Sequence, residues 1–215
     1  MSEQRVRIPV DQEVVLEGGY RVPSGRAKGA ALVLHPHPLY GGSMHNNVVE
    51  ALGEAAVEAG WAALRFNFRG VGRSTGRHDQ GRGEQDDVLA AGRWLRGEGH
   101  RRLALLGYSF GSLVGAQAAA RLEGLSCGVW VSPPLILGDL PPWTQDMGPL
   151  LVLVGTADEF TSVEGLEHYV QAQGTHVTMI TLSGSDHFWW GEESVLVRET
   201  ERFLSRVDET GIEKD

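Results

Sequence analysis

Three residues suited to acyl-transfer chemistry each follow an apolar stretch, and they occur in the order Ser109, Asp158 and His187. A serine hydroxyl is a weak nucleophile at neutral pH, so an imidazole must accept its proton during attack on a carbonyl carbon. A carboxylate then holds the imidazole in the required tautomer and stabilises its protonated form. Hydrolases whose serine sits on a strand-to-helix turn show the same order of serine, acid and histidine. We therefore take these three residues as the candidate catalytic set.

Ser109 lies at the centre of Gly107-Tyr108-Ser109-Phe110-Gly111, a Gly-x-Ser-x-Gly motif. Residues 103–106 are apolar and typical of a buried strand, and the small residues that follow the motif favour a helix. This setting predicts a nucleophile elbow, a tight turn that pushes the serine hydroxyl out of the sheet. Glycine is expected on both sides because a side chain there would collide with a neighbouring strand or helix.

Two other carboxylates compete with Asp158 for the role of the acid. Glu159 is its neighbour, and Asp186 immediately precedes His187. Asp158 has the more suitable position in the turn after the apolar residues 150–154, whereas Asp186 would normally point away from the ring next to it. We favour Asp158 and keep the other two as alternatives.

Apolar runs alternate with helical patterns along the chain. Continuous apolar runs predict buried strands at residues 30–34, 61–68, 103–106, 127–131, 150–154 and 176–182. Helical spacing predicts helices at residues 47–59, 85–96, 110–122, 163–172 and 194–207. Near the N-terminus, residues 5–10 alternate like an edge strand, and residues 13–22 indicate a strand, a Gly-Gly turn and a return.

The alternation predicts an α/β fold, with a mostly parallel twisted sheet, helices on both faces and an antiparallel N-terminal edge. We expect a single domain over residues 1–215, with residues 208–215 as a frayed tail. In such a sheet, functional groups lie at the carboxyl ends of the strands. The three candidate residues all occupy positions of this kind.

Charge and composition argue against several classes of function. The 215 residues carry a formal net charge of -9, which disfavours binding to nucleic acid or to an anionic membrane. The single cysteine, Cys127, cannot form a disulfide within one chain. No signal peptide or membrane-spanning run is evident. We expect a soluble, cytoplasmic monomer or homodimer that needs no cofactor.

Five segments carry recognisable motifs, at residues 34–47, 65–74, 107–111, 155–160 and 184–188. Through them nearly the whole chain resembles the α/β-hydrolase superfamily, and most of all its small, lidless bacterial branch described as dienelactone-hydrolase-like. The resemblance implies the α/β-hydrolase fold, with Ser109 as nucleophile, Asp158 as acid and His187 as base. The dienelactone hydrolases themselves use a cysteine where this chain has Ser109.

The anionic tetrahedral intermediate of acyl transfer needs preorganised hydrogen-bond donors, which form an oxyanion hole. The backbone N–H of Phe110, directly after the nucleophile, is expected to be one of them. The second should come from the loop after residue 34, where Pro36 and Pro38 have no N–H to offer. Alignment with the family's motif in this loop implies Leu39, with Tyr40 as the alternative.

Residues 132–148 occupy the place where many α/β-hydrolases carry a lid, but this segment is too short for a helical lid and rich in proline. We therefore expect an open, shallow site. Aromatic residues near the expected site are the candidate substrate-binding residues: Tyr40, Phe110, Trp143, Phe160 and Phe188.

Three histidines, His35, His37 and His45, share the loop after residue 34. No carboxylate or cysteine joins them at the spacing of a metal site. We expect no metal there and assign these side chains to shaping the oxyanion loop through hydrogen bonds.

These features predict a serine hydrolase that cleaves a small or medium carboxylic ester or thioester through an acyl-enzyme intermediate. Two alternatives remain at this point. One is a binding protein that has the fold without the activity, and the other is a small peptidase or amidase.

Overall fold

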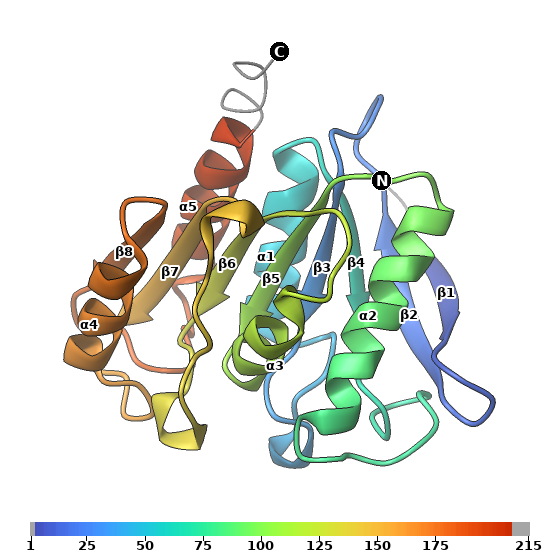
Figure 1. The fold of residues 1–215 in the computed structure, drawn as a ribbon, viewed down its shortest axis with the longest axis horizontal. Coiled ribbons are helices and arrows are strands. Elements are labelled where there is room, and N and C mark those ends of the chain that lie inside the picture. Colours follow the sequence, from blue (N-terminus) through green and yellow to red (C-terminus); the bar gives the residue numbers. More distant parts are fainter. Residues whose placement is uncertain (1–2, 208–215) are drawn as a thin grey trace.

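An eight-stranded sheet runs through the centre of the computed structural model, which describes residues 3–207 (Figure 1). In chain order the strands are β1 (Gln4–Pro9), β2 (Val15–Arg21), β3 (Ala30–Leu34), β4 (Ala62–Phe66), β5 (Leu103–Tyr108), β6 (Leu125–Val131), β7 (Leu150–Gly155) and β8 (Val177–Leu182). Their spatial order is β1-β2-β4-β3-β5-β6-β7-β8. Strands β1 and β2 are antiparallel to their neighbours, and all other pairs are parallel. The predicted fold is confirmed.

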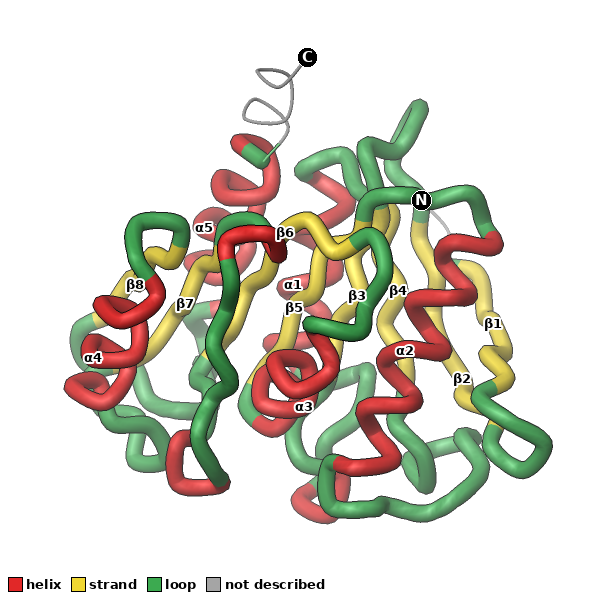
Figure 2. The backbone as a smooth tube through the Cα atoms, in the orientation of Figure 1, coloured by secondary structure: helices red, strands yellow, loops and turns green. Residues whose placement is uncertain are grey.

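Five α-helices cover the two faces of this sheet, as Figure 2 shows. They are α1 (Asn47–Glu58), α2 (Arg82–Gly97), α3 (Phe110–Ala119), α4 (Val163–Gln173) and α5 (Glu193–Arg206). Helices α2, α3 and α4 lie on one face, and α1 and α5 pack together on the other. Three short 3₁₀ helices lie in loops, at Pro38–Tyr40, Leu135–Leu137 and Gln145–Met147.

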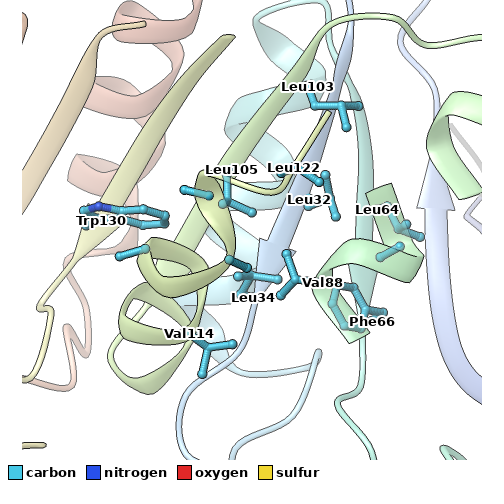
Figure 3. Close-up of a cluster of buried hydrophobic side chains, with 14 of the residues drawn as sticks. Leu32, Leu34, Leu64, Phe66, Val88, Leu103, Leu105, Val114, Leu122 and Trp130 are labelled. Carbon is cyan, nitrogen blue, oxygen red and sulfur yellow. The ribbon is translucent and has the colours of Figure 1, made fainter. Parts of the chain in front are cut away.

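The apolar runs of the central strands are continuous because both faces of the sheet are covered. Successive side chains of a strand point to opposite faces. In β3, Leu32 and Leu34 accordingly belong to the core beneath α2 and α3, whereas Ala31 and Val33 belong to the core beneath α1 and α5. Figure 3 shows the first of these cores. The indole of Trp130 from β6 lies in it as well.

The predicted Gly-Gly turn is wrong, because β2 runs straight through Gly18 and Gly19. Gly18 lies opposite Val6 of β1 on one side and Phe66 of β4 on the other. A Cβ atom on Gly18 would stand 3.0 Å from the carbonyl oxygen of Arg65. Glycine therefore allows a close approach of strands here, and the chain reverses earlier, where Val10 N–H donates to Val14 O.

The carboxyl ends of the six parallel strands share one edge of the sheet. Between β6 and β7 this edge carries only two short 3₁₀ helices, so no helical lid covers it. Residues 208–215, expected to form a frayed tail, lie outside the described residues. Within residues 3–207, the helices are all too short or too polar to cross a membrane.

Candidate active site

Ser109 sits between β5 and α3 in a backbone conformation that side chains rarely adopt, with φ of 52° and ψ of -123°. The two glycines of the motif make this turn possible. A Cβ atom on Gly107 would lie 2.6 Å from Ser112 N, and one on Gly111 would lie 2.5 Å from Leu34 O. The turn is therefore pressed against α3 on one side and β3 on the other, which is the packing of a nucleophile elbow.

A chain of hydrogen bonds joins the three candidate catalytic residues. The hydroxyl oxygen of Ser109 lies 2.9 Å from His187 Nε2. On the other side of the ring, Nδ1 lies 3.0 Å and 2.9 Å from the two carboxylate oxygens of Asp158. All three side chains are buried, and they reach one another from the loops after β5, β7 and β8. With Nδ1 protonated, Nε2 is free to accept the serine proton.

Neither alternative acid reaches the histidine ring. Glu159 is exposed, and the histidine ring is held by Asp158 instead. Asp186 instead caps its own loop, because its Oδ1 accepts hydrogen bonds from the N–H groups of Phe188 and Trp189 at 2.8 Å and 3.2 Å.

Asp158 is ionised at neutral pH although it is buried. Desolvation raises the pKa of its carboxyl, but hydrogen bonds from His187, the Ser132 hydroxyl and the Phe160 N–H outweigh burial, so the pKa falls below its ordinary value of 3.8. A carboxylate with several donors is held in its charged form. It can therefore stabilise a positive charge on His187.

Two contacts that we did not predict hold the loop of His187 in place. The hydroxyl of Tyr108, inside the elbow itself, donates to the carbonyl oxygen of His187 at 2.8 Å. Asn47 Nδ2, at the start of α1, donates to the carbonyl oxygen of Phe188 at 3.1 Å. Tyr108 thus connects the turn that carries Ser109 to the loop that carries His187.

The structure corrects the expected second oxyanion donor. The N–H of Leu39 donates to His37 Nδ1 at 3.2 Å, and the N–H of Tyr40 donates to His37 O at 3.1 Å, so both are already used. The backbone N–H groups of His37 and Phe110, in contrast, donate to no acceptor within residues 3–207. Because His37 lines the cleft together with Ser109, its N–H replaces that of Leu39 as the candidate donor.

The three loop histidines have separate environments. His35 is buried, and its Nε2 accepts the N–H of Phe68 at 3.0 Å while its Nδ1 lies 2.6 Å from Pro36 O. Burial lowers the pKa of His35 to about 4. Burial also lowers the pKa of His37, with a further effect of a nearby histidine. His45 is exposed on the surface. In residues 3–207 no three histidine, cysteine or acidic residues form a metal cluster.

A cleft of about 650 Å³ opens above the hydroxyl of Ser109. The expected residues Tyr40, Phe160 and Phe188 line it, and Phe160 lies against the His187 ring with centroids 4.6 Å apart. Further apolar residues also line the cleft: Pro134, Ile136, Leu137 and Trp190. The signal for them was the presence of apolar residues in loops that follow buried strands. A groove of similar size between α1 and α5 is lined mainly by glutamates and contains no member of the hydrogen-bonded chain.

Two expected substrate-binding side chains lie elsewhere. Trp143 is 2% exposed, its indole N–H donates to Gly148 O at 2.8 Å, and its ring packs edge-on against Trp130. The ring of Phe110 is buried among the rings of Phe68, His37 and His78. Both rings belong to the hydrophobic core. Of the two residues, only the backbone N–H of Phe110 remains a candidate part of the site.

A family model described as the alpha/beta hydrolase fold matches residues 32–151. Over 190 residues the chain is 33% identical to a protein of Rickettsia prowazekii, covering 81% of this chain and 77% of that one. An alpha-beta serine hydrolase homologue from Coxiella burnetii is 32% identical with a TM-score of 0.81, covering 94% of this chain and 97% of the other. A lidless serine hydrolase from Xanthomonas campestris is 31% identical with a TM-score of 0.82, covering 96% and 95%.

Proposed function

This chain belongs to the alpha/beta hydrolase fold family, and we propose that it is a serine hydrolase that cleaves carboxylic esters through an acyl-enzyme intermediate. The observation that carries the proposal is the hydrogen-bonded chain from Ser109 through His187 to Asp158 at the floor of an apolar cleft. The likeness to bacterial serine hydrolases along nearly the whole chain supports it.

In the first half of the reaction, Ser109 Oγ attacks the carbonyl carbon of the ester while its proton passes to His187 Nε2. Asp158 keeps the ring oriented and balances its charge. The carbonyl oxygen becomes an oxyanion, which the N–H groups of Phe110 and His37 stabilise at the N-terminal end of α3. When the intermediate collapses, the bond to the alkoxy group breaks, and His187 donates the proton to the departing oxygen.

In the second half, a water molecule attacks the acyl carbon of the Ser109 ester. His187 accepts a proton from this water and returns it to Ser109 Oγ as the acyl bond breaks. The products are a carboxylic acid and an alcohol, and the enzyme is restored. The same groups serve both halves, so no cofactor is required by this scheme.

The lining of the cleft favours uncharged substrates with apolar groups. Among residues 3–207, no lysine, arginine, aspartate or glutamate lines it. The chain as a whole has a formal net charge of -9, which repels anions. Thioesters of coenzyme A carry phosphate groups that would meet no cationic side chain in this cleft. We therefore favour neutral esters over such thioesters.

Labelling with a fluorophosphonate probe tests the proposed activity. Wild-type protein should be labelled and should hydrolyse p-nitrophenyl acetate and butyrate. Ser109→Ala should lose labelling and lose turnover on the order of 10⁴-fold or more. An acyl-coenzyme A series tests the substrate class and should react far more slowly than the neutral esters. Wild-type protein that neither reacts with the probe nor turns over any ester would overturn the proposal in favour of a binding protein.

A further inference from the structure

Two residues next to the hydrogen-bonded chain have a backbone conformation that side chains avoid. Ser132 has φ of 47° and Trp189 has φ of 59°, and both side chains are completely buried. Outside glycine this region is rare, above all for a bulky residue. Ser132 directly follows β6, and Trp189 follows His187 by two positions. Such conformations persist only where the surrounding structure requires them, and they gather at functional sites.

The two residues contact each other, and Ser132 in turn acts on the acid. The indole N–H of Trp189 donates to Ser132 Oγ at 3.0 Å. The Ser132 hydroxyl also lies close enough to the Asp158 carboxylate to lower the pKa of that carboxyl. A hydroxyl has one proton, so acceptance of the indole N–H leaves that proton available to the carboxylate. The contacts therefore run from the indole of Trp189 through the Ser132 hydroxyl to the Asp158 carboxylate.

We propose that Ser132 and Trp189 are positioning residues that hold Asp158 in the orientation in which both of its oxygens face His187 Nδ1. This inference rests on the proposed hydrolase activity of the same site. Neither residue touches the substrate or the reacting atoms, and both act through the acid.

The other contacts of Asp158 explain why a further donor matters. The N–H of Phe160 donates to its Oδ1 at 2.9 Å, and His187 Nδ1 lies within 3.0 Å of both oxygens. Without the Ser132 hydroxyl, fewer contacts oppose rotation of the carboxylate about its side-chain bond. A rotated carboxylate would hold the ring of His187 less firmly and would balance its charge less well when the serine proton arrives.

The backbone of both residues joins the loops that carry the acid and the base. Ser132 N–H donates to Leu153 O in β7, so Ser132 is anchored to the strand that ends just before Asp158. Trp189 N–H donates to Asp186 in the loop of His187. The indole–hydroxyl contact thus connects the loop after β6 to the loop after β8, and the acid lies between them.

Four variants test the proposal: Ser132→Ala, Trp189→Phe, the double variant of both, and Thr161→Val as a matched control. Thr161 is also buried, and its hydroxyl donates to Pro133 O at 2.7 Å, but it does not contact the carboxylate. It therefore reports the loss of a buried hydroxyl that joins the loop after β6 to the loop after β7.

The first measurement is steady-state hydrolysis of p-nitrophenyl butyrate. Loss of a hydrogen bond to a charged group should lower kcat of Ser132→Ala about tenfold or more with KM unchanged. Trp189→Phe should lower kcat by a smaller factor. The double variant should be no slower than Ser132→Ala, because both residues act through one contact. Thr161→Val should keep kcat within about twofold.

The second measurement needs no substrate. The proton on His187 Nδ1 gives a downfield NMR resonance when it is held by a carboxylate. Ser132→Ala and Trp189→Phe should shift this resonance or broaden it through exchange, and Thr161→Val should leave it unchanged. Because the resonance does not depend on turnover, it separates failure of this proposal from failure of the proposed function.

Three results would overturn the proposal. The first is an unchanged Nδ1 resonance in Ser132→Ala, whether or not the protein hydrolyses esters. The second is a kcat of Ser132→Ala within twofold of wild type. The third is an equal loss of kcat in Thr161→Val, which would mean that the effect comes from loop stability alone.

Discussion

The buried His35 should make the stability of the fold depend on pH in a defined way. Its ring is buried, and Nε2 accepts the N–H of Phe68, so only the neutral ring fits this place. Burial lowers its pKa from 6.5 to about 4. In the unfolded chain the ring regains its ordinary pKa, and acid therefore favours the unfolded state.

The size of the effect follows from the difference between the two pKa values. A shift from 6.5 to about 4 corresponds to a change of about 3 kcal/mol in the free energy of unfolding. The stabilisation is fully present above about pH 6.5 and is lost as the pH falls toward about 4, because the unfolded state binds the proton first. By about pH 4.5 the loss should reach about 2.5 kcal/mol.

The assay is urea unfolding, followed by tryptophan fluorescence, of wild type and His35→Gln at a series of pH values. Glutamine offers an acceptor for the Phe68 N–H but does not titrate, so the difference between the two proteins removes the contribution of all other groups. The stability of wild type relative to this variant should fall by about 2.5 kcal/mol between about pH 7.5 and about pH 4.5. A difference that stays constant over this range would refute the reasoning.

Three further variants test particular contacts. Gly111→Ala places a methyl group 2.5 Å from a carbonyl oxygen of β3 and should destabilise the fold by about 3 kcal/mol or prevent folding; normal thermal unfolding would contradict this. Tyr108→Phe removes the donor to His187 O and should lower kcat/KM about fivefold in ester hydrolysis. Undiminished activity would show that the Tyr108 hydroxyl does not hold the His187 loop in place. Trp143→Ala should cost about 3–5 kcal/mol in chemical unfolding, whereas Trp190→Ala should raise KM and leave stability unchanged; the reverse pattern would restore Trp143 to the cleft.

The fold could be predicted because its main signals are local. Continuous apolar runs marked the central strands, since both faces of the sheet are covered. The order of Ser109, Asp158 and His187 was readable for the same reason, because each follows such a run at the carboxyl end of a strand. Gly18 shows the limit of this reading, because a glycine that admits a neighbouring strand looks the same in sequence as one that forms a turn.

The details of the site depend on contacts between distant segments, which no local pattern reports. Trp143 and Trp190 both lie in loops, yet one is 2% exposed and the other 73%. The burial of Trp143 follows from its packing on Trp130, which is remote in sequence. Leu39 and Tyr40 do not suit the role expected of them as oxyanion donors, because the side chain and the carbonyl of His37 accept their N–H groups.

The loops that form the site are joined to one another by side chains that donate to backbone carbonyls. Tyr108 donates to the carbonyl of His187, and Asn47 donates to that of Phe188. Each such bond contributes about 1 kcal/mol, so no single one determines the geometry. Together they link the segments after β3, β5 and β8, so the groups of the proposed site are already in place before substrate arrives. Preorganisation of this kind removes the need for a closing lid, and it accounts for a cleft that is both open to solvent and ordered at its floor.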